Sequence, residues 1–234
     1  MARVKAVFVA VVGIWTGMST TALASFVTFS GSDASQNLSA NVTFTDLGGG
    51  GLEVSLVNSF TGDTVDQAHV LTGVFFSGAV GLTPVSATAG PGSLEWVAGS
   101  SSAPPPSSFL GTEWAYGTGT APGSATAGIV SAGYYTPGNG NFASGGDMLD
   151  GSGWGILSAG YAGSHLDGLD SRPYIQNTIV FDLSGFNGNL SGIGNVTFQY
   201  GTSLSEPSTT GSQVPEPASL CLAMFGAVLL LRRR

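Results

Sequence analysis

The chain has 234 residues, of which 37 are glycine and one is cysteine, and its formal net charge is −8. Residues 25–214 contain 13 acids, one arginine and no lysine, which gives this region a formal charge of −12. It cannot neutralise phosphates, so binding to nucleic acids and to anionic lipid surfaces is excluded. The single cysteine, Cys221, lies outside it, so burial and backbone pairing must stabilise the fold without disulfides.

The N-terminus carries the features of an export signal. Two positive residues precede an apolar run at 6–17, and Ala22 and Ala24 have the small-x-small spacing of a signal-peptidase site. The run is shorter than the ~20 residues that cross a bilayer, which favours a removable signal over a permanent transmembrane helix. We therefore interpret residues 1–24 as a signal peptide with a helical apolar part.

Alternating patterns predict β-strands in the first half of the exported region. At 41–45 and 52–56 every second residue is apolar, which places one face of each strand against a core. The four glycines at 48–51 supply the unusual backbone angles of a turn, so the two strands form a hairpin. The more continuous apolar run at 70–76 predicts a buried strand.

The middle of the chain contains predicted loops and a short internal repeat. Residues 100–108 hold three consecutive prolines between serines, and residues 137–146 are rich in glycine and asparagine, so both predict loops. Residues 128–134 read Gly-Ile-Val-Ser-Ala-Gly-Tyr and recur almost unchanged at 155–161. Two copies do not make a solenoid. They favour a pair of similar strands packed on one neighbour over a duplicated ligand platform using the two tyrosines.

Two further alternating segments, at 178–183 and 196–200, predict strands late in the chain. No segment between the two ends keeps a convincing helical period. The prediction is therefore an all-β fold, a two-sheet β-sandwich of jelly-roll type over residues 25–205, because a sheet with one apolar face must cover it with another. A β-helix is the alternative, and residues 206–214 are expected to be a linker.

Candidate catalytic and metal-binding residues are few. Asp147, Asp150, Asp167 and Asp170 lie beside glycines and could offer oxygen ligands to calcium, although neither pair matches a known calcium loop. Turn-forming aspartates are the alternative interpretation of the same pattern. His165 lies between a serine and Asp167, but adjacency in sequence is not the geometry of a catalytic triad. We therefore assign no catalytic residue and no cofactor, and keep calcium as the one candidate ion.

A carbohydrate-binding surface would need exposed aromatic rings with polar neighbours. Six rings lie in glycine-rich surroundings that leave room for exposure: Trp96, Trp114, Tyr116, Trp154, Tyr161 and Tyr174. Aromatic side chains are more often part of a core, so each ring alone is a weak candidate.

The C-terminus combines three unlike elements in a fixed order. Pro215, Glu216 and Pro217 form a rigid acidic tripeptide, residues 218–231 are apolar, and Arg232, Arg233 and Arg234 end the chain. As a helix the 14 apolar residues would rise about 21 Å, against a hydrocarbon core of about 30 Å, so they make a marginal anchor. The arginines are expected on the cytoplasmic side of the membrane.

This order resembles the PEP-CTERM sorting signal that bacterial exosortases recognise, here at 215–234. Residues 26–60 and 195–201 are also similar to β-rich proteins of that class. The resemblance implies a Gram-negative, exopolysaccharide-making host, transient inner-membrane anchoring, exosortase processing near the tripeptide, and a final place on the cell surface or outside the cell. It implies no catalytic residues, because the shared motif belongs to the sorting tag.

The resulting expectation is a non-enzymatic surface or matrix protein, associated with exopolysaccharide or biofilm matrix. Its partners during export would be signal peptidase and exosortase. A carbohydrate-binding module is the first alternative, and a secreted glycan hydrolase is the second.

Overall fold

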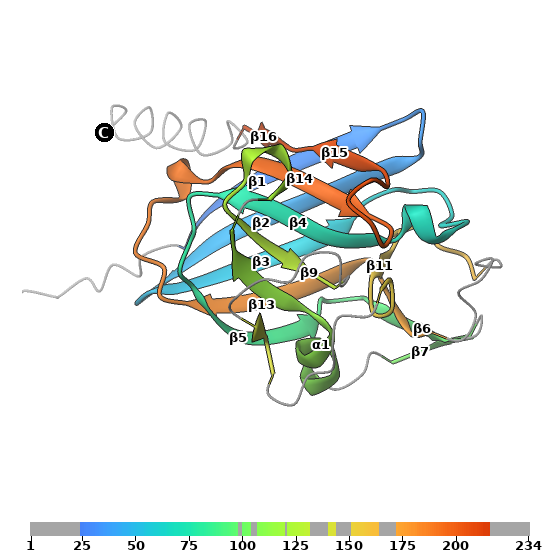
Figure 1. Ribbon diagram of the computed structural model, residues 1–234. Coiled ribbons are helices and arrows are strands. Elements are labelled where there is room, and N and C mark those ends of the chain that lie inside the picture. The colour runs from blue at the N-terminus through green and yellow to red at the C-terminus, as the bar shows by residue number, and fades with distance from the viewer. Residues whose placement is uncertain are drawn as a thin grey trace, which may run out of the picture.

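The computed structural model describes two β-sheets packed face to face, with very little helix (Figure 1). This confirms the predicted all-β sandwich. A β-helix, the alternative prediction, would wind strands along one axis rather than pack two sheets. The described residues are 24–97, 100–103, 107–119, 121–131, 140–143, 151–163 and 172–215.

Among the described residues, one sheet has six strands and the other has ten. The six-stranded sheet has the order β16-β1-β2-β3-β13-β5, and the larger sheet is centred on β4 and its partners β9, β11 and β14. The strands are β1 Ser25–Asp33, β2 Leu38–Gly48, β3 Gly51–Asn58, β4 Leu71–Ser77, β5 Thr83–Ala89, β6 Leu94–Val97, β7 Ser100–Ser102, β8 Ala115–Thr118, β9 Ala127–Val130, β10 Gly140–Asn141, β11 Ile156–Leu157, β12 Tyr174–Gln176, β13 Thr178–Ser184, β14 Gly194–Tyr200, β15 Ser208–Thr210 and β16 Ser212–Val214. The helices are α1 Ser107–Glu113 and the 3-10 helices η1 Gln67–His69, η2 Pro122–Ser124 and η3 Leu190–Gly192.

The predicted hairpin is present as β2 and β3. Phe44 lies opposite Val54 in the register, and all the alternate apolar side chains of the two strands are buried. The turn between them places Gly48, Gly49 and Gly50 at φ values of +73°, +61° and +87°, which disfavour residues with a Cβ. The glycine run therefore fixes the turn, and the alternation fixes which face of the sheet is buried.

The predicted strand at 70–76 is present as β4, which is buried on both faces. It pairs on one side with β14, while β9 and β11 pair with successive parts of it. These two short strands belong to the two copies of the internal repeat, so the prediction of two similar strands on one neighbour is confirmed. Tyr161, at the end of the second copy, is buried, and Tyr134 lies outside the described residues.

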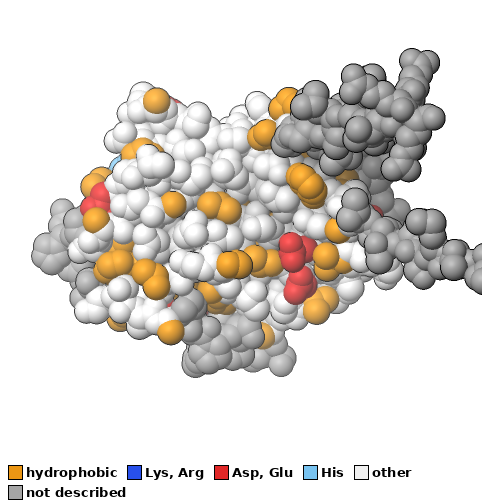
Figure 2. Space-filling view, turned by 180° about the vertical axis from the view of Figure 1, so that it is seen from behind, with side chains coloured by type: hydrophobic (Ala, Val, Ile, Leu, Met, Phe, Trp, Pro, Cys, Tyr) orange, Lys and Arg blue, Asp and Glu red, His pale blue; other side chains and the backbone are white. Residues whose placement is uncertain are grey.

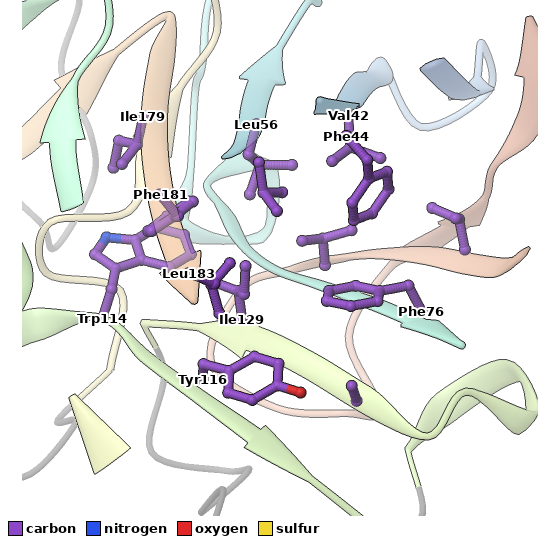
Figure 3. Close-up of a cluster of buried hydrophobic side chains, with 14 of the residues drawn as sticks. Val42, Phe44, Leu56, Phe76, Trp114, Tyr116, Ile129, Ile179, Phe181 and Leu183 are labelled. Carbon is purple, nitrogen blue, oxygen red and sulfur yellow. The ribbon is translucent and has the colours of Figure 1, made fainter. Parts of the chain in front are cut away.

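The core lies between the two sheets and is rich in aromatic rings (Figure 3). Phe44 from the six-stranded sheet meets Phe76 of β4 edge-on, with ring centroids 5.0 Å apart. Further along, the Phe181 ring of β13 packs on Trp114, again with centroids 5.0 Å apart. Each fully buried ring contributes roughly 1.5–3 kcal/mol through burial, so these contacts join the sheets without any disulfide.

The predicted loop at 100–108 is partly wrong. Ser100–Ser102 form β7, which pairs with β6, and α1 begins at Ser107. Both elements depend on partners distant in sequence: α1 packs along the edge strand β5 and buries Leu110. A short serine-rich or glycine-containing segment carries no local signal of such contacts.

Strand β14 also differs from its predicted half-exposed pattern, because both its faces are buried. Thr197 and Gln199 are 7% and 1% exposed, although they are polar and alternate with Val196, Phe198 and Tyr200. The Gln199 side chain donates to the carbonyl oxygens of Ser203 and Glu206 at 3.0 and 3.2 Å. The turn after β14 therefore folds back over the polar face of its own strand.

The buried Tyr200 leads to a pH prediction. Burial raises the pKa of its phenol above the usual value of 10.0, and the nearby backbone of Ser39 opposes this less strongly. Above pH 10 the unfolded chain therefore loses a proton that the folded chain keeps, and stability should fall by about 1.4 kcal/mol per pH unit. Urea unfolding at pH 9, 10 and 11 should show a shallower loss for Tyr200→Phe. Identical pH dependence in the two proteins would contradict this.

Candidate functional site

The first and last strands of the described fold, which we call the body, meet on one edge of the six-stranded sheet. Strand β16, the last strand of the body, pairs antiparallel with β1, the first, and the register places Val214 opposite Thr28 and Ser212 opposite Ser30 (Figure 1). Ala24, the residue before β1, and Pro215, the residue after β16, are both exposed. We call this region, defined by Ala24, Phe26, Leu47, Val214 and Pro215, the signal-bearing end.

The predicted linker at 206–214 contains two strands. β15 pairs with β14 in the larger sheet and β16 pairs with β1 in the smaller one, so the chain crosses between the sheets at Gly211. A Cβ on Gly211 would lie 2.8 Å from a methyl carbon of Val196, and one on Gly31 would lie 2.9 Å from the Phe198 ring. The crossing therefore requires glycine at both positions, and the body extends to Val214.

Glu206 and Gln199 hold the turn that leads into this crossing. The Glu206 carboxylate accepts hydrogen bonds from the backbone N–H and the hydroxyl of Thr202. With the Gln199 contacts to the same turn, these bonds fix the start of β15 against the body. Alternating apolar residues do not reveal such a segment, and the only sequence signal for it is the pair of short β-prone stretches on either side of Gly211.

Strand β16 ends where the Pro-Glu-Pro tripeptide begins. If the register with β1 continued, residues 215, 216 and 217 would lie opposite Val27, Phe26 and Ser25. Pro215 is not part of the strand. Proline has no backbone N–H to donate to a neighbouring strand, so a proline at 215 and another at 217 remove donors from that continuation.

The structure places two of the predicted signal residues and leaves the others outside its described part. Ala24 directly precedes β1 and Pro215 directly follows β16, so both lie at the same end of the β1–β16 pair. Ala22, Glu216, Pro217 and Arg232, Arg233 and Arg234 lie outside the described residues. Within the part that the structure describes, no helix has the length and apolar character needed to cross a membrane.

The four calcium candidates, Asp147, Asp150, Asp167 and Asp170, lie outside the described residues, as does His165. Within the described ranges, no group of three or more histidine, cysteine or acidic residues lies together so as to hold a metal ion. His69 is tied into the fold: its Nδ1 lies 2.7 Å from an Asp66 carboxylate oxygen and its Nε2 lies 3.0 Å from the Gln36 carbonyl. That ring links η1 to the turn between β1 and β2.

Four of the six candidate aromatic rings are core residues, as aromatic side chains more often are. Trp114, Tyr116, Tyr161 and Tyr174 are buried, and Trp96 and Trp154 are only partly exposed. The Trp96 ring stands edge-on to Tyr161 at 4.9 Å, and its Nε1 donates to Gln176 at 2.8 Å. Burial also raises the pKa of the Tyr174 phenol, with smaller opposite effects from Ser152 and Arg172. The six rings are therefore core and packing residues and do not form a flat sugar platform.

The outer face of the six-stranded sheet is polar. One row across it joins Thr28, Thr43, Ser55, Val180 and Thr88, and the next row places Glu53 directly opposite Asp182. Ser86 donates a hydrogen bond of 2.7 Å to Asp182, and the hydroxyls of Thr28 and Thr43 lie 2.9 Å apart. Figure 2 shows a surface on which hydrophobic side chains are scattered; the largest acidic group lies among them, and smaller acidic areas lie apart from it.

Comparison with known proteins identifies the C-terminal segment. The family model of the PEP-CTERM protein-sorting motif matches residues 213–234, which includes the last two residues of β16. No curated protein and no solved structure is similar enough to match the chain. The chain thus carries a PEP-CTERM sorting signal, whose processing partner is exosortase, and it is an exported protein of the cell surface or extracellular space.

Proposed function

We propose that the exported body is a non-enzymatic component of the extracellular matrix, held transiently at the inner membrane by residues 218–231 and then released by cleavage near Pro215. One observation carries this proposal: the sorting signal continues directly from β16, a strand of the folded body. The sorting signal is therefore attached directly to a strand of the folded body. Cleavage of the chain after β16 would leave all strands of the sandwich in place.

The polar side chains inside the described body support a structural role. Asn58 donates to the carbonyl oxygens of His69 and Ile156, and Thr64 bonds to the hydroxyl and backbone N–H of Ser158. The Asn58 and Thr64 side chains therefore join loops to strands by hydrogen bonds within the fold. The hydroxyl-rich outer face of the six-stranded sheet offers donors and acceptors to a hydrated polysaccharide, which is the partner that we propose in the matrix.

Replacing Pro215, Glu216 and Pro217 together with alanine should leave the protein uncut in the inner membrane of its native host, because exosortase loses the tripeptide that it recognises. Fractionation into inner membrane, surface, matrix and medium gives the location, and mass spectrometry of both termini gives the processing state. The wild-type protein should begin at Ser25, lack Arg232–Arg234 and be released from washed cells when the polysaccharide is digested. Normal delivery of the alanine variant would refute the sorting assignment, and retention on digested cells would refute the matrix partner.

A further inference from the structure

We propose that the signal-bearing end of the sandwich rests on the outer surface of a zwitterionic phospholipid bilayer while the C-terminal segment is still attached. This inference depends on the membrane anchoring proposed above. It adds an orientation, since it names the surface of the body that contacts lipid and the side chains that do so.

The first argument is the length of chain between the body and the apolar run. Pro215 is the last described residue, and only Glu216 and Pro217 separate it from Ala218, where the apolar run begins. Three residue steps span at most about 11 Å even when fully extended. The polar headgroup layer of one leaflet is itself about 5–8 Å thick. An anchored body therefore has almost no room to stand away from the membrane.

The second argument is the shortness of the apolar run. Its 14 residues rise about 21 Å as a helix, which is less than the hydrocarbon thickness of about 30 Å. A segment shorter than the bilayer is accommodated by thinning the membrane or by drawing its flanking residues inward. With three arginines after its far end, this segment draws the body toward the lipid.

The third argument is that both export signals join the body at the same end. The antiparallel register of β1 and β16 places the beginning of the first strand beside the end of the last, with Thr28 opposite Val214. The signal peptide precedes β1 and is also membrane-bound until it is cleaved. The same end of the sandwich therefore faces the membrane during both processing steps.

The side chains at this end suit a lipid surface. Phe26, Leu47 and Val214 are 46%, 53% and 43% exposed, although all three are apolar. Phe26 and Val214 flank Thr28 on one face of the sheet, and Leu47 follows Asp46, which is paired with Ser25. The Asp46 carboxylate accepts a hydrogen bond of 2.8 Å from the Gly48 backbone. With no lysine between residues 25 and 214, the partner is a zwitterionic rather than an anionic headgroup.

The opposite end of the sandwich supplies matched control positions. Val65 and Leu204 are 51% and 46% exposed, close to the values at the signal-bearing end. Val65 precedes Asp66, whose partner His69 also contacts the turn between β1 and β2, at the end of β1 remote from Ser25. Leu204 lies in the turn between β14 and β15. β1 has nine residues and is about 30 Å long, so these positions should stand well clear of the lipid.

The test uses the full chain with Cys221→Ser, reconstituted in phosphatidylcholine vesicles. Single cysteines introduced as Phe26→Cys, Val214→Cys, Val65→Cys and Leu204→Cys carry a fluorescent label, and the quencher is a nitroxide on the lipid headgroup. We expect several-fold stronger quenching at positions 26 and 214 than at 65 and 204. Flotation of the vesicles measures anchoring separately.

The outcomes separate the two proposals. Protein that floats with the vesicles but is quenched equally at both ends, or more strongly at 65 and 204, overturns the orientation and leaves the anchoring intact. Protein that does not float overturns both. Strong quenching at 26 and 214 that disappears when the chain is cut after Val214 shows that the tail holds this end on the lipid.

Discussion

Replacing Phe181 with alanine is expected to lower the free energy of unfolding by about 3–5 kcal/mol, the usual cost of removing a large ring from a core. Phe181 is completely buried on β13, between β3 and β5 of the six-stranded sheet. Its ring centroid lies 5.0 Å from that of Trp114 and 5.1 Å from that of Phe142, so one substitution empties a contact that joins the two layers.

The neighbouring residue provides the control. Val180 lies on the same strand but on the outer face, where its side chain is partly exposed. Val180→Ala should change stability by less than about 1 kcal/mol, because it opens no cavity. Urea unfolding of the three proteins, monitored by tryptophan fluorescence and by circular dichroism, gives the comparison. Similar losses for both variants would mean that the two sheets are not joined by packing around Phe181.

The sequence predicts these core positions because each strand meets the core with one face only. Phe44 and Val54 alternate with threonine, serine or glutamate, and Phe181 lies between the partly exposed Val180 and Asp182, so the period of two leaves a single way to bury them. The turn at 48–51 is also predictable from the sequence, because its backbone angles disfavour residues other than glycine. The local alternation of apolar and polar residues is sufficient to predict the buried positions of a strand wherever its other face is exposed to water.

The pattern fails where contacts distant in sequence cover both sides. Gln199 looks like an outward residue, yet it is buried by its own following turn. The glycine-rich surroundings of Trp154 are a pattern in which a ring could be exposed, but a Cβ on Gly155 would lie 2.5 Å from a Val70 methyl carbon, so that glycine permits close packing instead. The pairing of β16 with β1 has the same origin: a three-residue strand has too few positions to show alternation, and only its distant partner makes it a strand.

That pairing gives a second large prediction. Replacing Pro215 and Pro217 with threonine restores two backbone donors beside β1 and introduces a residue that favours strands. β16 should then extend along Ser25–Val27, in the register already set by Thr28 and Val214. New hydrogen bonds of about 1 kcal/mol each would slow amide exchange in the N-terminal part of β1 roughly 5- to 30-fold. The measurement is hydrogen exchange by mass spectrometry on the full chain in detergent.

In the native host the same double variant should accumulate uncut, because Glu216 would be drawn into the sheet and away from exosortase. Of Ser212 and Gln213, one directs its backbone N–H toward β1, so adding Ser212→Pro and Gln213→Pro removes that donor whichever residue carries it. Amide exchange at Ser25–Val27 should then return to its wild-type rate. If exosortase cleavage and the amide exchange rate both return to wild-type values in this fourfold variant, Pro215 and Pro217 act by keeping the tripeptide off the sheet. If exchange recovers and cleavage does not, exosortase reads the prolines directly. Exchange that never slows in the double variant would mean that proline is not what ends β16.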